Sequence, residues 1–392
     1  MSRATAVVER STGEWSVDAA ARLRSGWEPS VLLVLTAMLL AIGVVSVYSA
    51  SAVMAQSQQL PHYYFVTRQV TGAAAGFALL LAMAWLDYRR LRIFAWPVLL
   101  GLIVVLIVMI LPGTQALAPV TNGARRWFYL GPVGMQPSEL AKLALLIWTA
   151  ALAVKKQDRL GSLSRGLLPF LVMWALVSGL IFLQPSMSAA VLVVLLSALV
   201  VFAAGARIGH FLLLAFIGVP LLWSQVEGVA YRMRRITAFF DPAQDPAGLS
   251  YQITQSLTAI GSGGIFGRGF GHGVQKFGYL PEPHNDFLFA MIGEEWGFIG
   301  ALVVISLFAA FAVVGYRIAR NAPDQFGFLL AIGVTNLIAV QAMLHIAVNL
   351  ALIPTTGVTL PFMSYGRSSL LVCLMAVGIL INIGRRTSEV AA

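Results

Sequence analysis

Ten long, predominantly apolar segments constrain this chain more than any other feature of its sequence. A helix needs about 20 apolar residues to cross roughly 30 Å of hydrocarbon. The segments do not alternate as the strands of a membrane barrel do, so they predict spanning helices. We place these spans at residues 30–50, 68–86, 93–111, 137–154, 167–183, 187–204, 209–227, 286–315, 326–350 and 364–384. The fold class is therefore an all-α integral membrane protein, a polytopic bundle of about ten transmembrane helices.

Composition excludes the soluble classes. Of the residues, 59% are hydrophobic and only 11% are charged, whereas about a quarter are charged in a typical soluble domain. The net charge of +10 would suggest nucleic acid in a soluble protein, but here membrane topology explains it and we expect no nucleic-acid partner. The single cysteine, Cys373, lies in the last apolar segment, so no disulfide is expected in the loops. The first apolar segment is too long for a signal-peptide core, and we expect no cleavable signal.

The distribution of lysine and arginine predicts the topology. If the N-terminus is cytoplasmic, 16 of the 26 basic residues lie on the cytoplasmic side, which favours cytoplasmic termini and an even number of crossings. We find no linker that would separate two domains. We predict a cytoplasmic N-terminal tail (1–29), one membrane domain (30–384) and a cytoplasmic C-terminal tail (385–392). The membrane domain carries two extracytoplasmic loops, 112–136 and 228–285, and the larger one lies between the seventh and eighth spans.

A glycine-rich run from Gly261 to Gly273 lies in the larger loop. It contains neither the dinucleotide-binding nor the P-loop spacing of glycines, and no strand precedes it. We expect a flexible loop whose aromatic residues rest on lipid headgroups. Close approach of its backbone N–H groups to a phosphate is the alternative.

Four arginines of the predicted outer loops are candidates for binding phosphate. Arg125 and Arg126 are adjacent, whereas Arg232 and Arg235 are three residues apart and would share one face of a helix. Guanidinium groups suit bidentate contacts with phosphate oxygens. Anchoring at the membrane interface explains them about equally well, and their outer location slightly favours a functional role.

Polar residues within the spans have structural and functional interpretations. Glu139 and Lys142 share a helix face, and an ion pair is the preferred interpretation because an isolated charge there costs at least about 2.5 to 3.5 kcal/mol. A structural role is also preferred for Glu294 and Glu295 of the eighth span. The ninth span carries polar residues at every fourth position, which is typical of hydrogen bonding between helices. These residues are Gln341, His345 and Asn349. No spacing of histidines or of Cys373 indicates a zinc site, so no metal ligand is predicted.

Asp286 stands where a polar loop meets the eighth span, in the segment 280–287. A carboxylate at this place could cap the helix, because the helix dipole favours negative charge at its N-terminus. It could equally be a catalytic group. The residues alone leave these two alternatives open.

Five segments together give the chain a resemblance to a known family. They read NGARRW at 122–127, QPSELAK at 136–142, YQ..QSL.AIGSGG.FG.G at 251–269, LPEPHNDFLFAMIGEE at 280–295, and PTTGVTLPFMSYGRSS at 354–369. On these motifs the chain resembles the SEDS proteins, the FtsW and RodA peptidoglycan polymerases, from Pro29 to Arg386. Thr359 makes it more similar to the division branch, FtsW, than to the elongation branch.

The resemblance implies a multi-pass protein of the inner membrane that polymerises lipid II at the outer face. The family's catalytic aspartate falls on Asp286, which the resemblance makes the general base of an inverting glycosyltransferase. Substrate-binding residues are expected at Arg125, Arg126, Glu139, Lys142, Arg232, Arg235 and His284. The implied partner is a class B penicillin-binding protein of the division or elongation machinery. No cofactor is certain, although a divalent cation (Mg²⁺ or Mn²⁺) could assist at the pyrophosphate.

Two positions depart from the family pattern. Ser186 replaces an acidic residue, and Arg367 replaces a glycine and adds a cation near the outer mouth. Other functional classes also remain open. One is a lipid II flippase that uses Glu139, Lys142 and His345 as a pathway. Another is a catalytically silent scaffold for a transpeptidase, and a third is an elongation-type polymerase.

Overall fold

The computed structural model describes residues 26–121, 123–131, 133–241 and 248–391. Most of the predicted N-terminal tail, with its four arginines, lies outside these residues. So do Asn122 of the first motif, residues 242–247 of the larger loop, and Ala392.

Each predicted span corresponds to a helix whose ends differ from the prediction by a few residues, except that the first, eighth and tenth helices extend further. Nine helical stretches of the described chain are long and apolar enough to cross a membrane, and α7 is a shorter apolar helix of 17 residues. The all-α polytopic fold is thereby confirmed. The helices are α2 (Glu28–Ser57), α3 (Tyr64–Trp85), α4 (Tyr88–Ile110), α5 (Pro137–Lys155), α6 (Leu168–Leu183, preceded by a π-turn at Leu163–Leu167), α7 (Met187–Ala203), α8 (Ile208–Glu227), α11 (Leu288–Arg320), α12 (Gln325–Asn349) and α13 (Arg367–Ala391).

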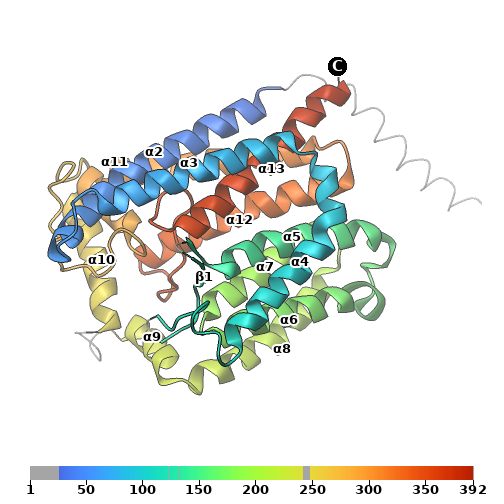
Figure 1. Cartoon of the computed structure of the whole chain (residues 1–392), viewed down its shortest axis with the longest axis horizontal. Coiled ribbons are helices and arrows are strands. Elements are labelled where there is room, and N and C mark those ends of the chain that lie inside the picture. The colour runs from blue at the N-terminus through green and yellow to red at the C-terminus, as the bar shows by residue number, and fades with distance from the viewer. Residues whose placement is uncertain (1–25, 122, 132, 242–247, 392) are drawn as a thin grey trace, which may run out of the picture.

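The spanning helices form two groups in contact (Figure 1). Helices α2, α3, α11 and α13 pack along one side, and α4 to α7 pack on the other. Helix α12 lies between the groups and contacts members of both. Helix α8 is at the margin, where none of its membrane-spanning window is buried.

Ion pairs join several helices at one end of the bundle. Arg317 of α11 lies 3.5 Å from Glu28 of α2, and Arg89 of α4 lies 3.0 Å from Asp324, which caps α12. Arg386 of α13 lies 3.4 Å from a carboxylate oxygen in the turn between α3 and α4. The start of α2 and the end of α13 are therefore at the same end of the bundle, as an even number of crossings requires.

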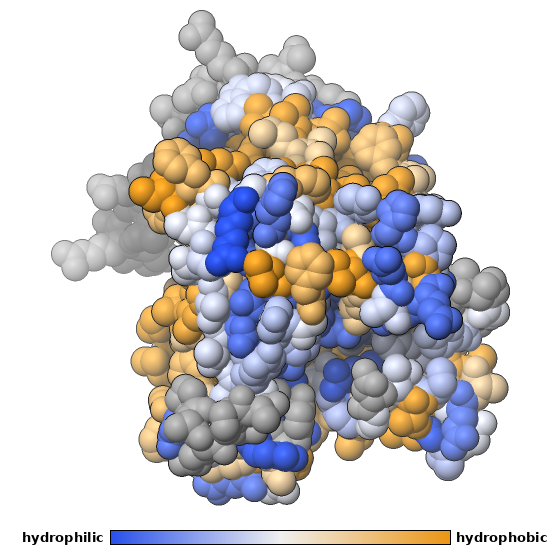
Figure 2. Space-filling model, turned by 90° about the vertical axis from the view of Figure 1, so that its left-hand side faces the viewer, coloured by the Kyte–Doolittle hydropathy of each residue, from blue (hydrophilic) through white to orange (hydrophobic). Residues whose placement is uncertain are grey.

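The opposite end carries most of the loop structure. Helices α9 (Ala230–Phe240) and α10 (Leu249–Gly263) belong to the larger loop, and a hairpin of β1 (Phe128–Leu130) and β2 (Val133–Met135) belongs to the smaller one. The strands are antiparallel, with Tyr129 opposite Gly134. Figure 2 looks onto this end, whose centre is largely hydrophilic with a hydrophobic row across it.

The glycine-rich run is docked on α11, which differs from the flexible loop expected from sequence. Helix α11 is broken at Gly297, where φ is 69°. At this break the N–H of Phe298 donates to the carbonyl of Gly264 at 2.9 Å. A Cβ at Gly297 would stand 2.3 Å from the backbone nitrogen of Gly267, so glycine is needed for this approach. Phe266 is 79% exposed, and its contact with lipid headgroups stays a prediction.

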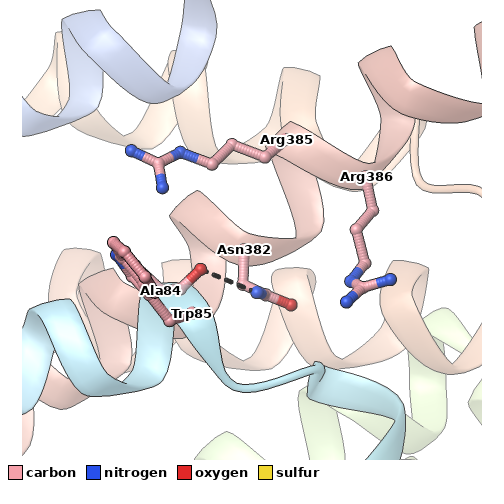
Figure 3. Close-up of a pocket in the computed structure, with 5 residues that line it drawn as sticks. All are labelled: Ala84, Trp85, Asn382, Arg385 and Arg386. Carbon is pink, nitrogen blue, oxygen red and sulfur yellow. Dashed lines mark hydrogen bonds between the residues drawn. The ribbon is translucent and has the colours of Figure 1, made fainter.

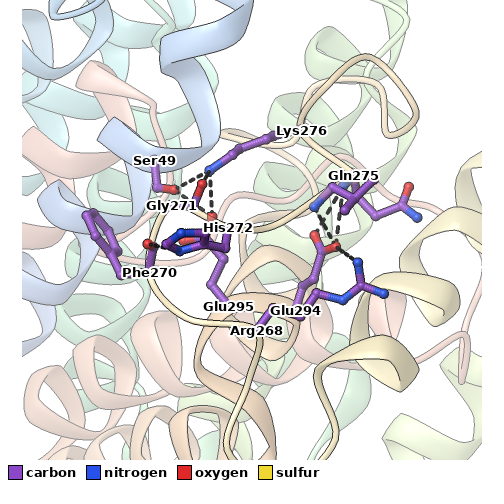
Figure 4. Close-up of polar contacts among 10 residues, drawn as sticks. Ser49, Arg268, Phe270, Gly271, His272, Gln275, Lys276, Glu294 and Glu295 are labelled. Atoms are coloured by element: carbon purple, nitrogen blue, oxygen red, sulfur yellow. Dashed lines mark hydrogen bonds and ion pairs between the residues drawn. The ribbon is translucent and has the colours of Figure 1, made fainter.

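Two buried carboxylates hold the segment that follows the glycine run (Figure 4). Glu294 accepts a hydrogen bond from the backbone N–H of Val274 at 2.8 Å. Glu295 pairs with Lys276 at 2.9 Å and accepts from the hydroxyl of Ser49 at 2.6 Å. These contacts tie α2, the loop and α11 together, in agreement with the structural role preferred for both glutamates.

We predict that Lys276→Met lowers the thermal stability of the protein. Lys276 is 6% exposed, and its removal leaves the carboxylate of Glu295 buried without its cation. Breaking a buried pair in this way costs about 3–5 kcal/mol. Thermal unfolding in detergent should show a clearly lower midpoint, together with faster proteolysis within residues 264–287.

Arg268→Gln is the matched control. Arg268 lies 3.9 Å from Glu294, and its side chain is 40% exposed. Without this arginine Glu294 still accepts hydrogen bonds from the backbone N–H groups of Val274 and Gln275, so we expect a smaller loss of stability than for Lys276→Met. Equal unfolding midpoints for the two variants would show that the buried pair does not stabilise the loop.

Candidate active site

Asp286 lies just before α11, and it does not cap that helix. The helix begins at Leu288, its N-cap residue is Phe287, and no side chain makes a capping hydrogen bond. The backbone N–H of Asp286 donates to the carbonyl of Glu282 at 3.1 Å, within a loop turn. The Asp286 residue is partly exposed. Its carboxyl group is therefore not used as the helix cap that the sequence allowed.

Asn349, at the end of α12, fixes the backbone at Asp286 and at Ala290. Its side-chain Nδ2 donates to the carbonyl of Asp286 at 3.2 Å, and its Oδ1 accepts from the N–H of Ala290 at 2.9 Å. Its own carbonyl accepts from the hydroxyl of Ser256 on α10 at 2.8 Å. Asn349 is fully buried. Through its side chain and its backbone carbonyl, Asn349 thus joins α12 to α10 and to the start of α11 at the candidate site.

The loop between α12 and α13 holds the same segment from another direction. The hydroxyl of Ser364 donates to the carbonyl of Asn285 at 2.8 Å, and the N–H of Tyr365 donates to the carbonyl of His284 at 3.0 Å. Gly357 of this loop has φ +70°, and a Cβ there would lie 3.9 Å from Oδ2 of Asp286. The loop therefore forms one wall beside the carboxylate.

His284 packs in an aromatic contact. Its ring centroid is 4.7 Å from that of Phe65 and 5.4 Å from that of Tyr365, and the residue is 2% exposed. Burial lowers the pKa of His284 to about 4, so the imidazole is neutral at pH 7. In this conformation His284 supports the loop by packing, and its predicted contact with a substrate would require it to move.

The charges around Asp286 set its protonation. Burial, together with the neighbouring carboxyl group of Glu282, raises the pKa of Asp286 to about 6, against the charges of Arg235 and Arg126, which lower it. At pH 7 the group is therefore mostly ionised, yet close enough to neutrality to accept and return a proton. Such a pKa suits a general base.

Two of the four predicted arginines act on the charge of Asp286. These are Arg126 and Arg235, and they also donate to backbone carbonyls, of Pro185 and of Thr355 respectively. The other two arginines make their described hydrogen bonds elsewhere. Arg125 donates to the carbonyl of Leu111 at 3.0 Å, and Arg232 donates to that of Gln225 at 3.0 Å and lies 4.4 Å from the centroid of Phe182.

Glu139 and Lys142 form the ion pair that the sequence favoured. The Nζ of Lys142 lies 2.8 Å from Glu139 and 3.0 Å from Oε1 of Gln341 on α12. The Lys142 side chain is only 2% exposed, and that of Glu139 is 13% exposed. The pair joins α5 to α12, and its predicted contact with substrate stays a prediction.

The polar residues at every fourth position of α12 form hydrogen bonds to neighbouring segments. Gln341 reaches Lys142, His345 contacts the carbonyl of Val358 through Nδ1 at 2.8 Å, and Asn349 holds the Asp286 segment. Sequence reasoning identified these residues from their spacing but did not identify their targets. The contribution of Ser364 and Gly357 was also missed, because nothing in their local sequence indicates which distant backbone they meet.

The two departures from the family pattern lie at this same end. Ser186 is the N-cap residue of α7 and makes no capping hydrogen bond through its side chain. Arg367 begins α13, and its side chain passes close to Gly72 of α3. A Cβ added at Gly72 would lie 3.3 Å from the Cγ of Arg367. Within the described part of the chain, no group of three or more His, Cys, Asp or Glu side chains is arranged to hold a metal ion.

Comparisons with known proteins agree with this architecture. A family model described as "Cell cycle protein", covering FtsW, RodA and SpoVE, matches residues 30–389. The chain is 43% identical over 353 residues to the "Probable peptidoglycan glycosyltransferase FtsW" of Trichlorobacter lovleyi, covering 90% of this chain and 92% of that protein. It is 40% identical to "Stage V sporulation protein E" of Bacillus subtilis, covering 91% of this chain and 96% of the relative.

Two solved structures are similar as well. One is described as "Structural coordination of polymerization and crosslinking by a peptidoglycan synthase complex", with a TM-score of 0.74 and 29% identity over 90% of this chain and 96% of that one. The other is the rod shape determining protein RodA of Thermus thermophilus, with a TM-score of 0.66 and 27% identity over 90% of this chain and 95% of that one. Because the family model and these relatives match the chain along nearly its whole length, the chain belongs to the SEDS family of FtsW, RodA and SpoVE proteins, and it is FtsW-like.

Proposed function

We propose that this protein is a peptidoglycan glycosyltransferase that polymerises lipid II into glycan strands, with Asp286 as its general base. The names of the FtsW relatives support the activity. The observation that carries the assignment of Asp286 is its placement: it is ionisable near neutral pH, partly exposed, free of any capping role and fixed by Asn349.

The proposed reaction is a single displacement with inversion. The Asp286 carboxylate accepts the proton of the 4-hydroxyl of the acceptor's N-acetylglucosamine. The oxygen then forms a bond to the anomeric carbon of the donor's N-acetylmuramic acid. The bond from that carbon to the pyrophosphate oxygen breaks, and undecaprenyl pyrophosphate leaves with the electron pair.

Positive charge near Asp286 suits the leaving group. Arg126 and Arg235 both act on the Asp286 charge, so they lie where a pyrophosphate beside the acceptor would develop negative charge. Arg125 and Arg232 are less suited to this role in the described conformation, because they donate hydrogen bonds to the backbone carbonyls of Leu111 and Gln225.

Whether a divalent cation takes part is a separate proposal. Asp286 and Glu282 supply two neighbouring carboxyl groups, and Mg²⁺ commonly uses one or two carboxylates together with phosphate oxygens of the substrate. Glu282 would hold the ion, which would neutralise charge on the pyrophosphate, and Asp286 would stay free to act as the base. The reaction steps above depend on the side chains of this protein.

We further propose that the Asp286 end faces the outside of the cell and that both termini are cytoplasmic. The charge bias of the sequence and the shared location of the two termini support this orientation. We also propose a class B penicillin-binding protein as partner in septal synthesis. The FtsW names of the relatives and the described synthase complex support a division role with a partner.

Asp286→Asn should retain expression and membrane insertion but lose most polymerisation. The amide keeps the size of the side chain and cannot act as a base, and a positioned base contributes about 10²- to 10⁴-fold. The measurement is the length and amount of glycan that purified protein makes from labelled lipid II, with and without its partner. Polymerisation at the normal rate by the variant would exclude the base assignment.

The same preparation separates the other functional classes. Translocation of lipid II in vesicles without polymer would favour a flippase. Normal division in cells that carry only Asp286→Asn would favour a scaffold. Glu227→Gln serves as the matched control, since it removes an exposed carboxylate at the end of α8 that does not act on the charge of Asp286 and leaves the proposed base.

The pH dependence of polymerisation provides an independent prediction. The base must be ionised, so kcat/KM should rise with pH, pass half of its maximum near pH 6, and then stay constant. Arg126→Gln and Arg235→Gln remove charges that lower the pKa of Asp286, so the midpoint should move to higher pH. Glu282→Gln should move it to lower pH.

Arg232→Gln is the control for this series, because Arg232 does not contribute to the pKa shift of Asp286. Its midpoint should match that of the wild type. Identical midpoints in all four variants would show that the titrating group is not Asp286.

A further inference from the structure

A cleft opens at the end of the bundle opposite Asp286, between the last turns of α3 and α13 (Figure 3). Its volume is about 200 Å³, several times the roughly 30 Å³ that one water occupies in the liquid. The residues that line it are Ala84, Trp85, Asn382, Arg385 and Arg386. The proposed glycosyl transfer uses none of them.

Asn382 builds the floor of the cleft and is not available to a ligand. Its Nδ2 donates to the carbonyl of Ala84 at 2.8 Å, and its Oδ1 accepts from the N–H of Tyr88 at 3.0 Å. These two hydrogen bonds fix the turn between α3 and α4 against α13. The cleft is therefore a built feature of the fold, and the arginines are the polar groups left to meet a ligand.

The two arginines have unused hydrogen-bonding capacity. Arg385 is exposed and makes no hydrogen bond or ion pair with any described residue, and Figure 3 shows it directed over Trp85. Arg386 lies 3.4 Å from Asp87 through one terminal nitrogen, while its Nε is buried and has no hydrogen-bond partner in the described chain. A ligand with several acceptor oxygens would satisfy these donors.

The surroundings of the cleft indicate how a ligand reaches it. Trp85 is 80% exposed at the last residue of the α3 span. Tryptophan at the end of a span is typical of the level of the lipid headgroups. An anionic lipid headgroup would reach this level by lateral diffusion in the membrane. Its phosphate would then lie beside the arginines and its glycerol beside the indole.

We propose that this cleft binds the phosphate of an anionic phospholipid in the leaflet around the termini. Asp87 is the acidic group that faces it, and it offsets part of the charge of Arg386. Two arginines against one carboxylate leave a net positive site. Basic pockets between helices are known to suit such headgroups on the cytoplasmic side, which is where the proposed orientation places this end.

Native mass spectrometry of the purified full chain tests the proposal. The probe is phosphatidylglycerol, and phosphatidylcholine with the same acyl chains is the neutral comparison. Arg385→Gln should weaken binding of phosphatidylglycerol about fivefold, and Arg385→Gln with Arg386→Gln about 25-fold, at about 1 kcal/mol for each arginine near the surface. Binding of phosphatidylcholine should not change. Arg385→Gln removes no described contact, so its loss of binding is not a folding defect.

Arg320→Gln is the matched control. Arg320 is an exposed arginine at the same end of the bundle, on the last turn of α11, away from the cleft. Its removal should leave phosphatidylglycerol binding unchanged. An equal loss in Arg320→Gln and Arg385→Gln would overturn the proposal in favour of diffuse attraction. Displacement of the lipid by millimolar inorganic phosphate would overturn the lipid as the source of the anion.

Discussion

The side-chain amide of Asn349 is the interaction on which the candidate site depends. It is fully buried at the end of α12 and bonds the backbone at Asp286 and at Ala290. A buried amide without these partners would cost about 1–3 kcal/mol, so the two segments are strongly held in one register. Because α12 also contacts both groups of helices, the position of Asp286 is set by the whole bundle.

A second constraint is the balance between burial and charge at the outer loops. Apolar surroundings alone would keep a carboxyl group neutral, and Arg126 and Arg235 bring Asp286 back towards ionisation. The docked glycine run and the Lys276–Glu295 pair keep the preceding loop against α11. The result is an acidic group that is poised near neutral pH and still partly exposed, which is what proton transfer from a sugar hydroxyl needs.

The sequence predicted the spans, the fold class and the Glu139–Lys142 pair, because each depends on local spacing along a helix. It also predicted that the polar residues at every fourth position of α12 form hydrogen bonds between helices. It did not predict the docking of the glycine run at Gly297, the hairpin of β1 and β2, or which two of the four arginines act on the charge of Asp286. These features depend on which distant backbone groups meet, and a single sequence carries no local signal for that.

Access to Asp286 from the outer water tests the central claim most directly. The measurement is labelling of Asp286→Cys in intact cells by a membrane-impermeant maleimide, which is specific because Cys373, the chain's single cysteine, is buried. We expect rapid labelling from outside, and none at a buried control position such as Asn349→Cys. Labelling that occurs only after the membrane is permeabilised would contradict it.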